Sequence, residues 1–341
     1  MSATDDAPLA AILGCAGPRL SEAERALFRA ARPVGFILFG RNVETPDQVA
    51  GLVAELRDLA GRPDTLVLID QEGGRVRRLG PPHWRAAPPQ GVFATLHRSD
   101  RAAAREAVRL NARLIAHDLA RLGINVDCLP LLDVADPMGH DVIGDRAFGA
   151  DPSVVGDLGR VCADALLEGG VLPVIKHLPG HGRARVDSHE ALPVVDAGRD
   201  LLEAVDFAPF RALSDAALGM TAHVVYTAID PERPATVSPA VVRDVIRSHI
   251  GFDGLLMSDD ISMKALNDDF ATRTARSLEA GCDVVLHCNG DLAEMRAVVD
   301  GCRALDAAGR VRLARAQAAL RPPAPFDADV ALTRLEEVMR A

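Results

Sequence analysis

Short apolar runs alternate with longer amphipathic segments along the chain. Several of these runs are almost continuous in Val, Ile and Leu, a pattern typical of strands that are buried on both faces of a parallel sheet. The runs therefore predict strands, and the segments between them predict helices that cover the sheet. The predicted strands fall at residues 9–14, 35–39, 65–69, 124–132, 171–175, 218–222, 254–258 and 283–288.

Several of the predicted helices begin with Asp or Ser, which are suited to cap a helix N-terminus. About eight β–α units of this kind predict a closed (β/α)8 barrel of the TIM type, in the α/β class, although a doubly wound open sheet also fits the alternation. The predicted helices include residues 21–32, 47–60, 100–122, 151–169 and 291–305.

No linker-like or low-complexity tract interrupts the chain. We therefore expect a single barrel domain over residues 1–341. The prolines near the start of the last stretch, from about residue 321 to residue 341, predict a broken turn followed by a final helix on the outside of the barrel.

Polar residues follow the predicted strands at the point where each strand ends. In a parallel barrel these carboxyl ends meet at one mouth, which is where the active sites of such barrels lie. One polar residue only marks where its strand stops, but at least five consecutive strands share the pattern, so we expect a functional mouth. The residues at these strand ends are Asp70, Asp133, Lys176, His177, His223, Asp259, Asp260, His287 and Asn289.

The composition is that of a globular protein with a large core, because 48% of the residues are hydrophobic and 25% are charged. The net charge of -10 argues against a nucleic-acid or anionic-membrane partner, since both need basic patches. No window reaches the roughly 18 apolar residues of a membrane span. The N-terminal stretch MSATDDAPLAAILGC lacks a basic region before its apolar run, so we expect a first strand there rather than a signal peptide.

The cysteines and histidines do not favour a metal site. The six cysteines include no CxxC pair, and most lie in apolar runs, so we expect buried free thiols and a reducing, cytoplasmic setting. His177 and His181 are four residues apart, but Pro179 and Gly180 between them prevent a shared helix face. We expect no metal and no cofactor, with a zinc site assembled from loop residues as the alternative.

Two adjacent carboxylates end the apolar run of GLLMSDDISM. A carboxylate at the end of a buried strand is held by a rigid scaffold, as a catalytic nucleophile requires. Neighbouring strand residues face opposite ways, so we expect one of Asp259 and Asp260 at the mouth while the other braces the loop. The alternative is a pair of helix N-cap residues without catalytic function.

Two glycine-containing segments carry arginines near strand ends. In DQEGGRVRRL, Asp70 precedes a Gly turn that Arg75 and Arg78 follow, and in IGDRAFG, Arg146 lies in a Gly-flanked loop. Such groups can recognise sugar hydroxyls or acyl groups through bidentate hydrogen bonds. The spacings GxGxxG and GxxxxGKS/T are both absent, which disfavours a phosphate-binding loop.

The segment KHLPGHGRARVDSHEALP gathers titratable side chains in a stretch that cannot form a regular helix. Asp187 and His189 lie two residues apart, so the carboxylate can orient the imidazole and raise its basicity. Histidine titrates near neutral pH and can both donate and accept a proton. The pair is therefore a candidate acid/base catalyst.

Together these motifs resemble the family 3 glycoside hydrolases, and among them the bacterial β-N-acetylhexosaminidases of the NagZ type. The resemblance runs in one order along residues 65–290 and implies the short, one-barrel form of the family. The motifs that carry it are LIDQEGGRVRRL, VIGDRAFG, KHLPGHG followed by VDSHEALP, MTAHVVYTAIDPERPATVS, LLMSDDISM and LHCNG.

The resemblance also implies roles for individual residues. Asp259 matches the catalytic nucleophile of the family, and Asp187 and His189 match a dyad in which the histidine is the general acid/base on a mobile loop. Further residues match positions that hold the N-acetylglucosamine ring, while Arg75 is assigned no sugar contact. The residues RARV before Asp187 differ from the commonest family wording. The ring-binding positions are Asp70, Arg78, Arg146, Lys176 and His177.

The reaction that the resemblance implies is retaining hydrolysis through a covalent glycosyl-Asp259 intermediate. The implied substrate is a muropeptide fragment from the cell wall (GlcNAc-1,6-anhydroMurNAc-peptide) that carries a terminal β-linked N-acetylglucosamine, as in peptidoglycan recycling. We expect a monomer that needs no cofactor and acts in the cytoplasm on this small-molecule substrate.

Other functions remain open at this point. A neutral histidine repels an incoming anion less than a carboxylate does, so phosphate can compete with water, as in a β-N-acetylglucosaminide phosphorylase. A β-glucosidase of the same superfamily is disfavoured by the DSH motif. A sugar-binding protein without catalysis is disfavoured by the presence of Asp259 and the complete dyad, and a metal-dependent barrel hydrolase would lose its activity on chelation.

Overall fold

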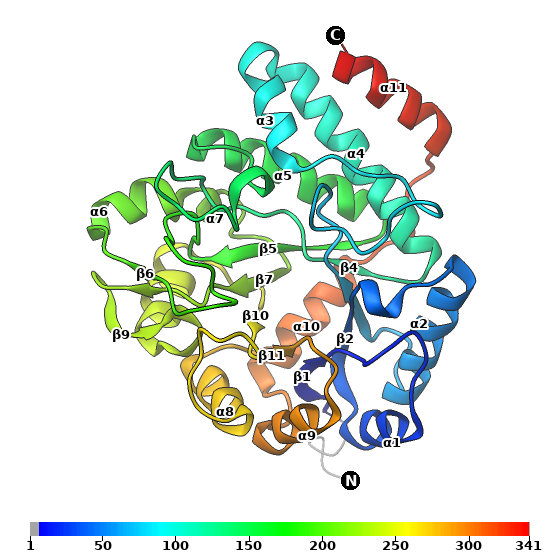
Figure 1. Ribbon diagram of the computed structural model, residues 1–341, viewed down its shortest axis with the longest axis vertical. Helices are drawn as coiled ribbons and strands as arrows, with labels where there is room; N and C mark the ends of the chain where they lie inside the picture. Colours follow the sequence, from blue (N-terminus) through cyan, green and yellow to red (C-terminus); the bar gives the residue numbers. More distant parts are fainter. Residues whose placement is uncertain (1–6, 341) are drawn as a thin grey trace.

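Eight parallel strands close into a barrel in residues 7–340, the part of the chain that the computed structural model describes (Figure 1). This confirms the predicted (β/α)8 barrel of the TIM type. Residues 1–6 and residue 341, the ends of the predicted domain, lie outside the described residues. In order around the barrel the strands are β1 (Leu9–Leu13), β11 (Val284–His287), β10 (Leu255–Asp260), β7 (Leu218–Thr221), β5 (Leu172–Leu178), β4 (Val126–Asp127), β3 (Leu66–Ile69) and β2 (Pro33–Leu38).

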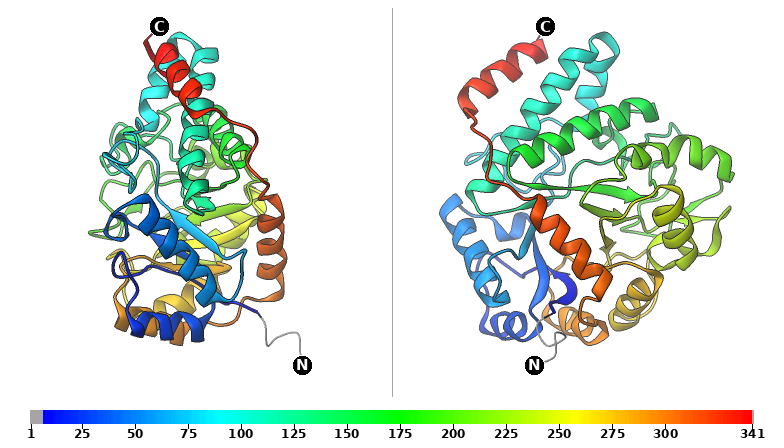
Figure 2. Two further views of the ribbon diagram at one scale, coloured as in Figure 1. Left: turned by 90° about the vertical axis from the view of Figure 1, so that its right-hand side faces the viewer. Right: turned by 180° about the vertical axis from the view of Figure 1, so that it is seen from behind.

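Helices form a ring outside the barrel and connect each strand to the next. One of them, α10, lies across the back of the barrel (Figure 2, right). The connection from β7 to β10 contains the π-helical segment Val241–His249 instead of an α-helix. The α-helices are α1 (Glu22–Ala31), α2 (Pro46–Ala60), α3 (Gln90–Ser99), α4 (Arg101–Arg121), α5 (Pro152–Glu168), α6 (Arg199–Leu201), α7 (Ala208–Ala212), α8 (Phe270–Ala280), α9 (Leu292–Gly301), α10 (Ala307–Ala319) and α11 (Ala328–Arg340).

Side-chain caps set the start of most of the predicted helices. Ser21, Asp100, Asp151 and Asp291 each accept a hydrogen bond from a backbone N–H in the first turn of the helix that follows. The start of α2 differs from the prediction by one residue, because Thr45 is its N-cap and a proline occupies the first helical position.

The fourth strand is much shorter than its apolar run. The sequence predicts a strand over residues 124–132, whereas β4 covers only Val126–Asp127. Leu129 N donates to the carbonyl of Asp127 at 2.8 Å in a local turn, and Pro130 has no N–H to donate, so the regular ladder stops. The chain continues as buried loop, with an isolated bridge between Leu131 and Lys176. This loop brings Asp133 to the mouth of the barrel.

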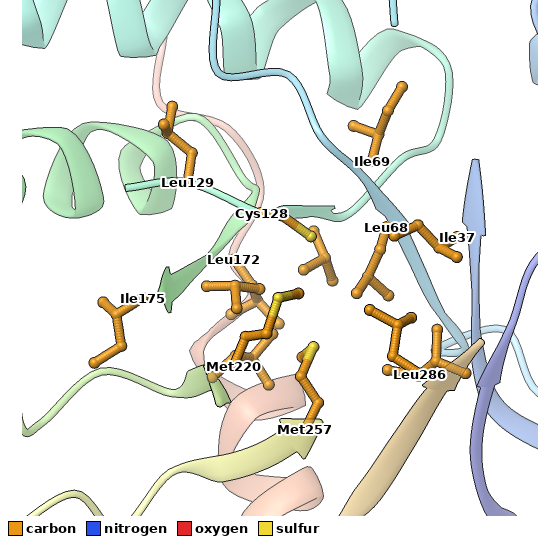
Figure 3. Packing of buried hydrophobic residues seen from close by; sticks show 14 of the residues in the cluster. Ile37, Leu68, Ile69, Cys128, Leu129, Leu172, Ile175, Met220, Met257 and Leu286 are labelled. Atoms are coloured by element: carbon orange, nitrogen blue, oxygen red, sulfur yellow. The ribbon is translucent and has the colours of Figure 1, made fainter. Parts of the chain in front are cut away.

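The interior of the barrel is filled by apolar side chains from alternate strand positions. Figure 3 shows Leu68, Cys128 and Met257 directed toward the centre of the barrel, and all three are fully buried. Their neighbours Ile69 and Leu129 point outward to the helices in the same view. The packed interior is a rigid base for the residues at the strand ends.

Two further elements lie outside the barrel. The strands β6 (Val194–Val195), β8 (Val225–Tyr226) and β9 (Asp230–Pro234) form a small separate sheet. After an extended stretch from residue 320 to residue 327, α11 packs against α4 (Figure 1). Among the described residues, no helix is both long enough and apolar enough to cross a bilayer.

Candidate active site

A pocket of about 520 Å³ opens at the carboxyl ends of the barrel strands. The structure brings all of the predicted site residues to this one pocket, although they come from segments that are far apart in the sequence. The predicted residues that line it are Asp70, Arg78, Arg146, Lys176, His177, Asp187, His189 and Asp259.

The floor of the pocket holds a buried ionic cluster around Lys176, whose side chain is only 2% exposed. The Nζ atom of Lys176 lies 3.0 Å from Asp70 Oδ1 and 2.5 Å from Glu72 Oε1. Arg78 Nη2 donates to the other oxygen of Asp70 at 2.9 Å. Burial alone would raise the pKa of the Asp70 carboxyl, but Lys176 and Arg78 outweigh it and hold the pKa below its usual range. These groups therefore stay charged at neutral pH.

Glu72 connects the loop that carries Arg146 to this cluster. Arg146 donates to the carboxylate of Glu72 through Nε and Nη2, both at 2.8 Å. Burial raises the pKa of Glu72, but Lys176 and Arg146 lower it more, to about 2. The sequence pattern predicts no role for Glu72, although this residue lies in the DQEGG motif between Asp70 and the Gly turn.

The glycine turn after β3 directs this motif into the pocket. Gly73 has φ +101°, and a Cβ atom there would lie 2.2 Å from the carbonyl oxygen of Pro88. Only glycine therefore fits at this point of the turn. Arg75 lines the pocket but is occupied by the next loop, because its guanidinium pairs with Asp141 and Asp145.

Asp133 fixes two histidines at the edge of the pocket. Its Oδ2 lies 2.7 Å from His177 Nδ1, and its Oδ1 accepts the backbone N–H of His181 at 2.6 Å. Burial raises the pKa of Asp133, but His177 and His181 outweigh it, and the pKa lies at about 2. The sequence marked Asp133 only as a strand end, since its partners lie more than forty residues further along the chain.

The two carboxylates at the end of β10 both line the pocket, but they have different hydrogen-bond partners. Asp260 accepts hydrogen bonds from Ser262 N, Ser262 Oγ and Cys288 N, so its carboxylate braces the loop. The carboxylate of Asp259, by contrast, accepts a hydrogen bond from the backbone N–H of Asp260. Burial raises the pKa of Asp259, but the nearby His177 and His223 lead the groups that lower it below its ordinary value. Asp259 thus presents an ionised carboxylate to the pocket.

Asp187 and His189 form the predicted pair on the loop that follows β5. His189 Nδ1 lies 2.7 Å from Asp187 Oδ1, which also accepts the backbone N–H of His189 at 2.9 Å. The His189 side chain is 63% exposed, whereas that of Asp187 is 22% exposed. Because Nδ1 faces the carboxylate, Nε2 is the ring nitrogen that is free to exchange a proton with a bound molecule.

A fixed carboxylate and a loop-borne imidazole–carboxylate pair thus share one pocket in the barrel mouth. This arrangement suits a reaction that needs a nucleophile together with an acid/base group. Within residues 7–340 no cluster of three or more His, Cys, Asp or Glu side chains is arranged to hold a metal ion. The described site offers carboxylate and imidazole groups to a bound molecule.

Comparisons with known proteins identify the family. The glycosyl hydrolase family 3 N-terminal domain matches residues 9–320. Over 282 residues the chain is 40% identical to a β-hexosaminidase of Alkalilimnicola ehrlichii, which covers 82% of this chain and 80% of the relative. The chain belongs to glycosyl hydrolase family 3.

Solved structures agree with this assignment. NagZ from Neisseria gonorrhoeae in complex with N-trifluoroacetyl-D-glucosamine is 32% identical, with a TM-score of 0.85 and 98% of each chain covered. A family 3 β-N-acetylglucosaminidase from Paenibacillus sp. is 29% identical, with a TM-score of 0.87, and the match covers 99% of this chain and 68% of that one. The protein is therefore a glycoside hydrolase of the β-hexosaminidase group.

Proposed function

We propose that this protein is a retaining β-N-acetylhexosaminidase of peptidoglycan recycling. Its substrate is a GlcNAc-1,6-anhydroMurNAc-peptide, from which it removes the terminal β-linked N-acetylglucosamine in the cytoplasm, as a monomer. The observation that carries the proposal is the meeting of Asp259 with the Asp187–His189 pair at one pocket. The N-trifluoroacetyl-D-glucosamine bound to the gonococcal NagZ supports an amino sugar as the ligand.

In the first step the ionised carboxylate of Asp259 attacks the anomeric carbon of the sugar. The bond from this carbon to the leaving-group oxygen breaks, and protonated His189 donates its Nε2 proton to that oxygen. Asp187 holds the ring through Nδ1 and stabilises its positive charge before the transfer. The product is a glycosyl ester on Asp259 and a free aglycone.

In the second step a water molecule attacks the same carbon from the face that the aglycone has left. His189 Nε2 takes a proton from this water, and the ester bond to Asp259 breaks. Two inversions return the sugar in its original β configuration. The step restores the carboxylate of Asp259 and the protonated state of His189.

The buried cluster on the pocket floor holds the sugar ring. Lys176, Arg78 and Arg146 line the pocket with donor groups, and Asp70 places acceptor oxygens beside them. Fixed charges of this kind suit a ring of hydroxyls, because each hydroxyl can donate to an acid and accept from a base. His177 supplies a further polar group that Asp133 holds in place.

Aryl glycosides test this function directly. The enzyme should release the aryl group from an aryl β-N-acetylglucosaminide much faster than from the matching aryl β-glucoside. The rates should not change when inorganic phosphate is added, and the first sugar product should be the β anomer by NMR. No aryl release from either substrate would contradict the enzyme, faster glucoside cleavage would assign a β-glucosidase, and a sugar phosphate product would assign a phosphorylase.

The natural substrate needs its own experiment. The protein should release free N-acetylglucosamine from purified GlcNAc-1,6-anhydroMurNAc-peptide, as detected by mass spectrometry of both products. A matched chito-oligosaccharide with the same terminal sugar is the control for the aglycone. Cleavage of the chito-oligosaccharide alone would overturn the proposed place in cell-wall recycling while the hydrolase activity would stand.

A further inference from the structure

The loop that carries Asp187 and His189 has two parts, which differ in how they are held. We call residues 179–184 the loop root and residues 185–191 the loop tip. In the root, a Cβ atom on Gly182 would lie 1.8 Å from the carbonyl oxygen of Val134, so backbone packs directly on backbone. His140 N also donates to the carbonyl of Ala184 at 2.7 Å. The root is thereby attached to the loop that follows β4.

Arg183 adds a charged bridge to the root. Its Nε donates to Asp206 Oδ2 and its Nη1 donates to Asp136 Oδ2, both at 2.7 Å. Asp136 belongs to the loop after β4, and Asp206 ends the π-helical segment Leu202–Asp206 on the other side of the root. One guanidinium therefore links three separate segments of the chain.

The bridge is largely removed from water. The side chains of Arg183 and Asp136 are each 21% exposed, and that of Asp206 is 2% exposed. Burial raises the pKa of Asp206 to about 6, although Arg183 acts to lower it. Loss of the guanidinium would leave Asp206 buried without its cation, so the bridge holds the root far more firmly than an exposed ion pair would.

The loop tip has much weaker attachments. Arg185, Val186, His189 and Glu190 are exposed. The tip reaches the rest of the protein through Ser188, whose Oγ lies 3.1 Å from His181 Nε2 and whose carbonyl accepts Ala265 N at 3.2 Å. Ser188 is thus the contact that seats the tip beside the pocket.

We propose that Arg183 is a positioning residue that fixes the loop root. With the root fixed, only the tip moves, and the reach of His189 to the leaving-group oxygen stays constant. This inference rests on the proposed acid role of His189. Arg183 does not line the pocket, and it acts through the chain that joins it to Asp187.

The fork of the guanidinium explains why arginine is needed. Two nitrogens in a rigid plane can serve Asp136 and Asp206 at the same time, whereas the single ammonium of a lysine cannot hold both in that geometry. Arg183→Lys should therefore recover only part of what Arg183→Ala loses. Asp136→Asn should weaken one arm of the bridge and give an intermediate loss.

Leaving-group dependence separates a positioning effect from a simple loss of folded protein. With poor leaving groups, kcat/KM of Arg183→Ala should fall by ~10- to 100-fold, because these substrates need a well-placed proton donor. With a dinitrophenyl leaving group, which needs no proton, kcat/KM should fall by less than ~3-fold. A reduced amount of active enzyme would lower both values equally.

Arg185→Ala is the matched control, since Arg185 lies two residues further on and makes no hydrogen bond or ion pair within residues 7–340. Its kcat/KM should match the unaltered enzyme with every leaving group. Equal losses for good and poor leaving groups in Arg183→Ala, or full recovery in Arg183→Lys, would overturn the inference. An unaltered enzyme without glycosidase activity would instead overturn the proposed function on which it rests.

Discussion

The pocket has two halves that are built in opposite ways. The half at the strand ends is a buried network, in which Lys176 is 2% exposed and touches two carboxylates. The half on the loop is open, and His189 is 63% exposed with a single carboxylate partner. Both halves use ion pairs between acids and bases, but only the first is shielded from water.

The difference fits the role that we propose for each half. In the buried half, partners of opposite charge move the pKa of Asp70 and Glu72 below their usual range, so the charges do not change near neutral pH. A group that must give and take a proton in each cycle cannot be held in this way. His189 is largely exposed and has the carboxylate of Asp187 beside Nδ1, which leaves Nε2 accessible to a bound molecule.

The largest expected effect concerns Asp259, the proposed nucleophile on the rigid half. Asp259→Ala should lower kcat by about 10⁴-fold or more, because it removes the carboxylate on which the proposed glycosyl ester forms. The protein should stay folded, as judged by circular dichroism. With a dinitrophenyl substrate, added azide should restore aryl release and yield the α-glycosyl azide, since the anion attacks from the vacated side.

Asp260→Asn is the matched variant for this test. Asp260 braces the loop through Ser262 and Cys288. Loss of its carboxylate should therefore lower the free energy of unfolding, with a smaller effect on kcat than Asp259→Ala has. Azide should not accelerate this variant. Azide rescue of Asp260→Asn together with an active Asp259→Ala enzyme would transfer the nucleophile role to Asp260.

The next effect is on stability and concerns the buried network. Glu72→Ala should lower the free energy of unfolding by about 3–5 kcal/mol, because Lys176 and Arg146 would remain buried without their shared partner. Urea unfolding followed by circular dichroism measures this loss. Glu190→Ala on the exposed loop tip is the control, with an expected change within about 0.5 kcal/mol. Similar losses in both variants would show that the two halves do not differ in the way described.

The barrel and the polar strand ends could be predicted from the sequence because both are local patterns. A strand buried on both faces must be apolar along its length, and Asp70, Lys176 and Asp259 stand out where such runs stop. The length of β4 could not be predicted in this way. Its apolar run continues past Pro130 as buried loop, and hydrophobicity alone does not separate the two.

The partners of the site residues were beyond sequence reasoning for a different reason. Glu72 pairs with Lys176 and Arg146, and Asp133 holds His181, across separations of tens of residues that only the closed barrel brings together. An acid in a glycine turn has no local feature that distinguishes a buried ion pair from a solvated side chain. The pair Asp187–His189 could be recognised because both members lie within three residues.

His181 provides a smaller effect that depends on pH. Burial lowers its pKa to about 4, although Asp133 acts to raise it. The histidine of the unfolded chain binds a proton near pH 6.5, whereas in the folded state it does so only near pH 4. The free energy of unfolding is therefore highest above pH 6.5 and decreases as the pH falls to about 4. The loss should approach about 3 kcal/mol, and urea unfolding between pH 7 and pH 4 measures it.

His181→Gln isolates this contribution, because glutamine can bond to Ser188 but does not titrate. The difference in unfolding free energy between the unaltered protein and this variant should shrink as the pH falls through that window. Other titrating groups, such as Asp206, are present in both proteins and cancel in the difference. A difference that stays constant from pH 7 to pH 4 would mean that His181 takes up its proton at the same pH in the folded protein as in the unfolded chain, and would contradict the lowered pKa.

The smallest expected effect comes from the exposed half. His189→Ala should lower kcat/KM by about 100-fold for poor leaving groups and by only a few fold for dinitrophenol, since the lost group supplies a proton and not a bond. Because His189 is 63% exposed and, within residues 7–340, pairs only with Asp187, the unfolding free energy should change little. This pattern is the reverse of the one expected for Glu72→Ala, which affects stability first. If His189→Ala lost as much unfolding free energy as Glu72→Ala, the loop would be held as part of the buried network. The proton donor of the proposed mechanism would then have to be another group at the pocket.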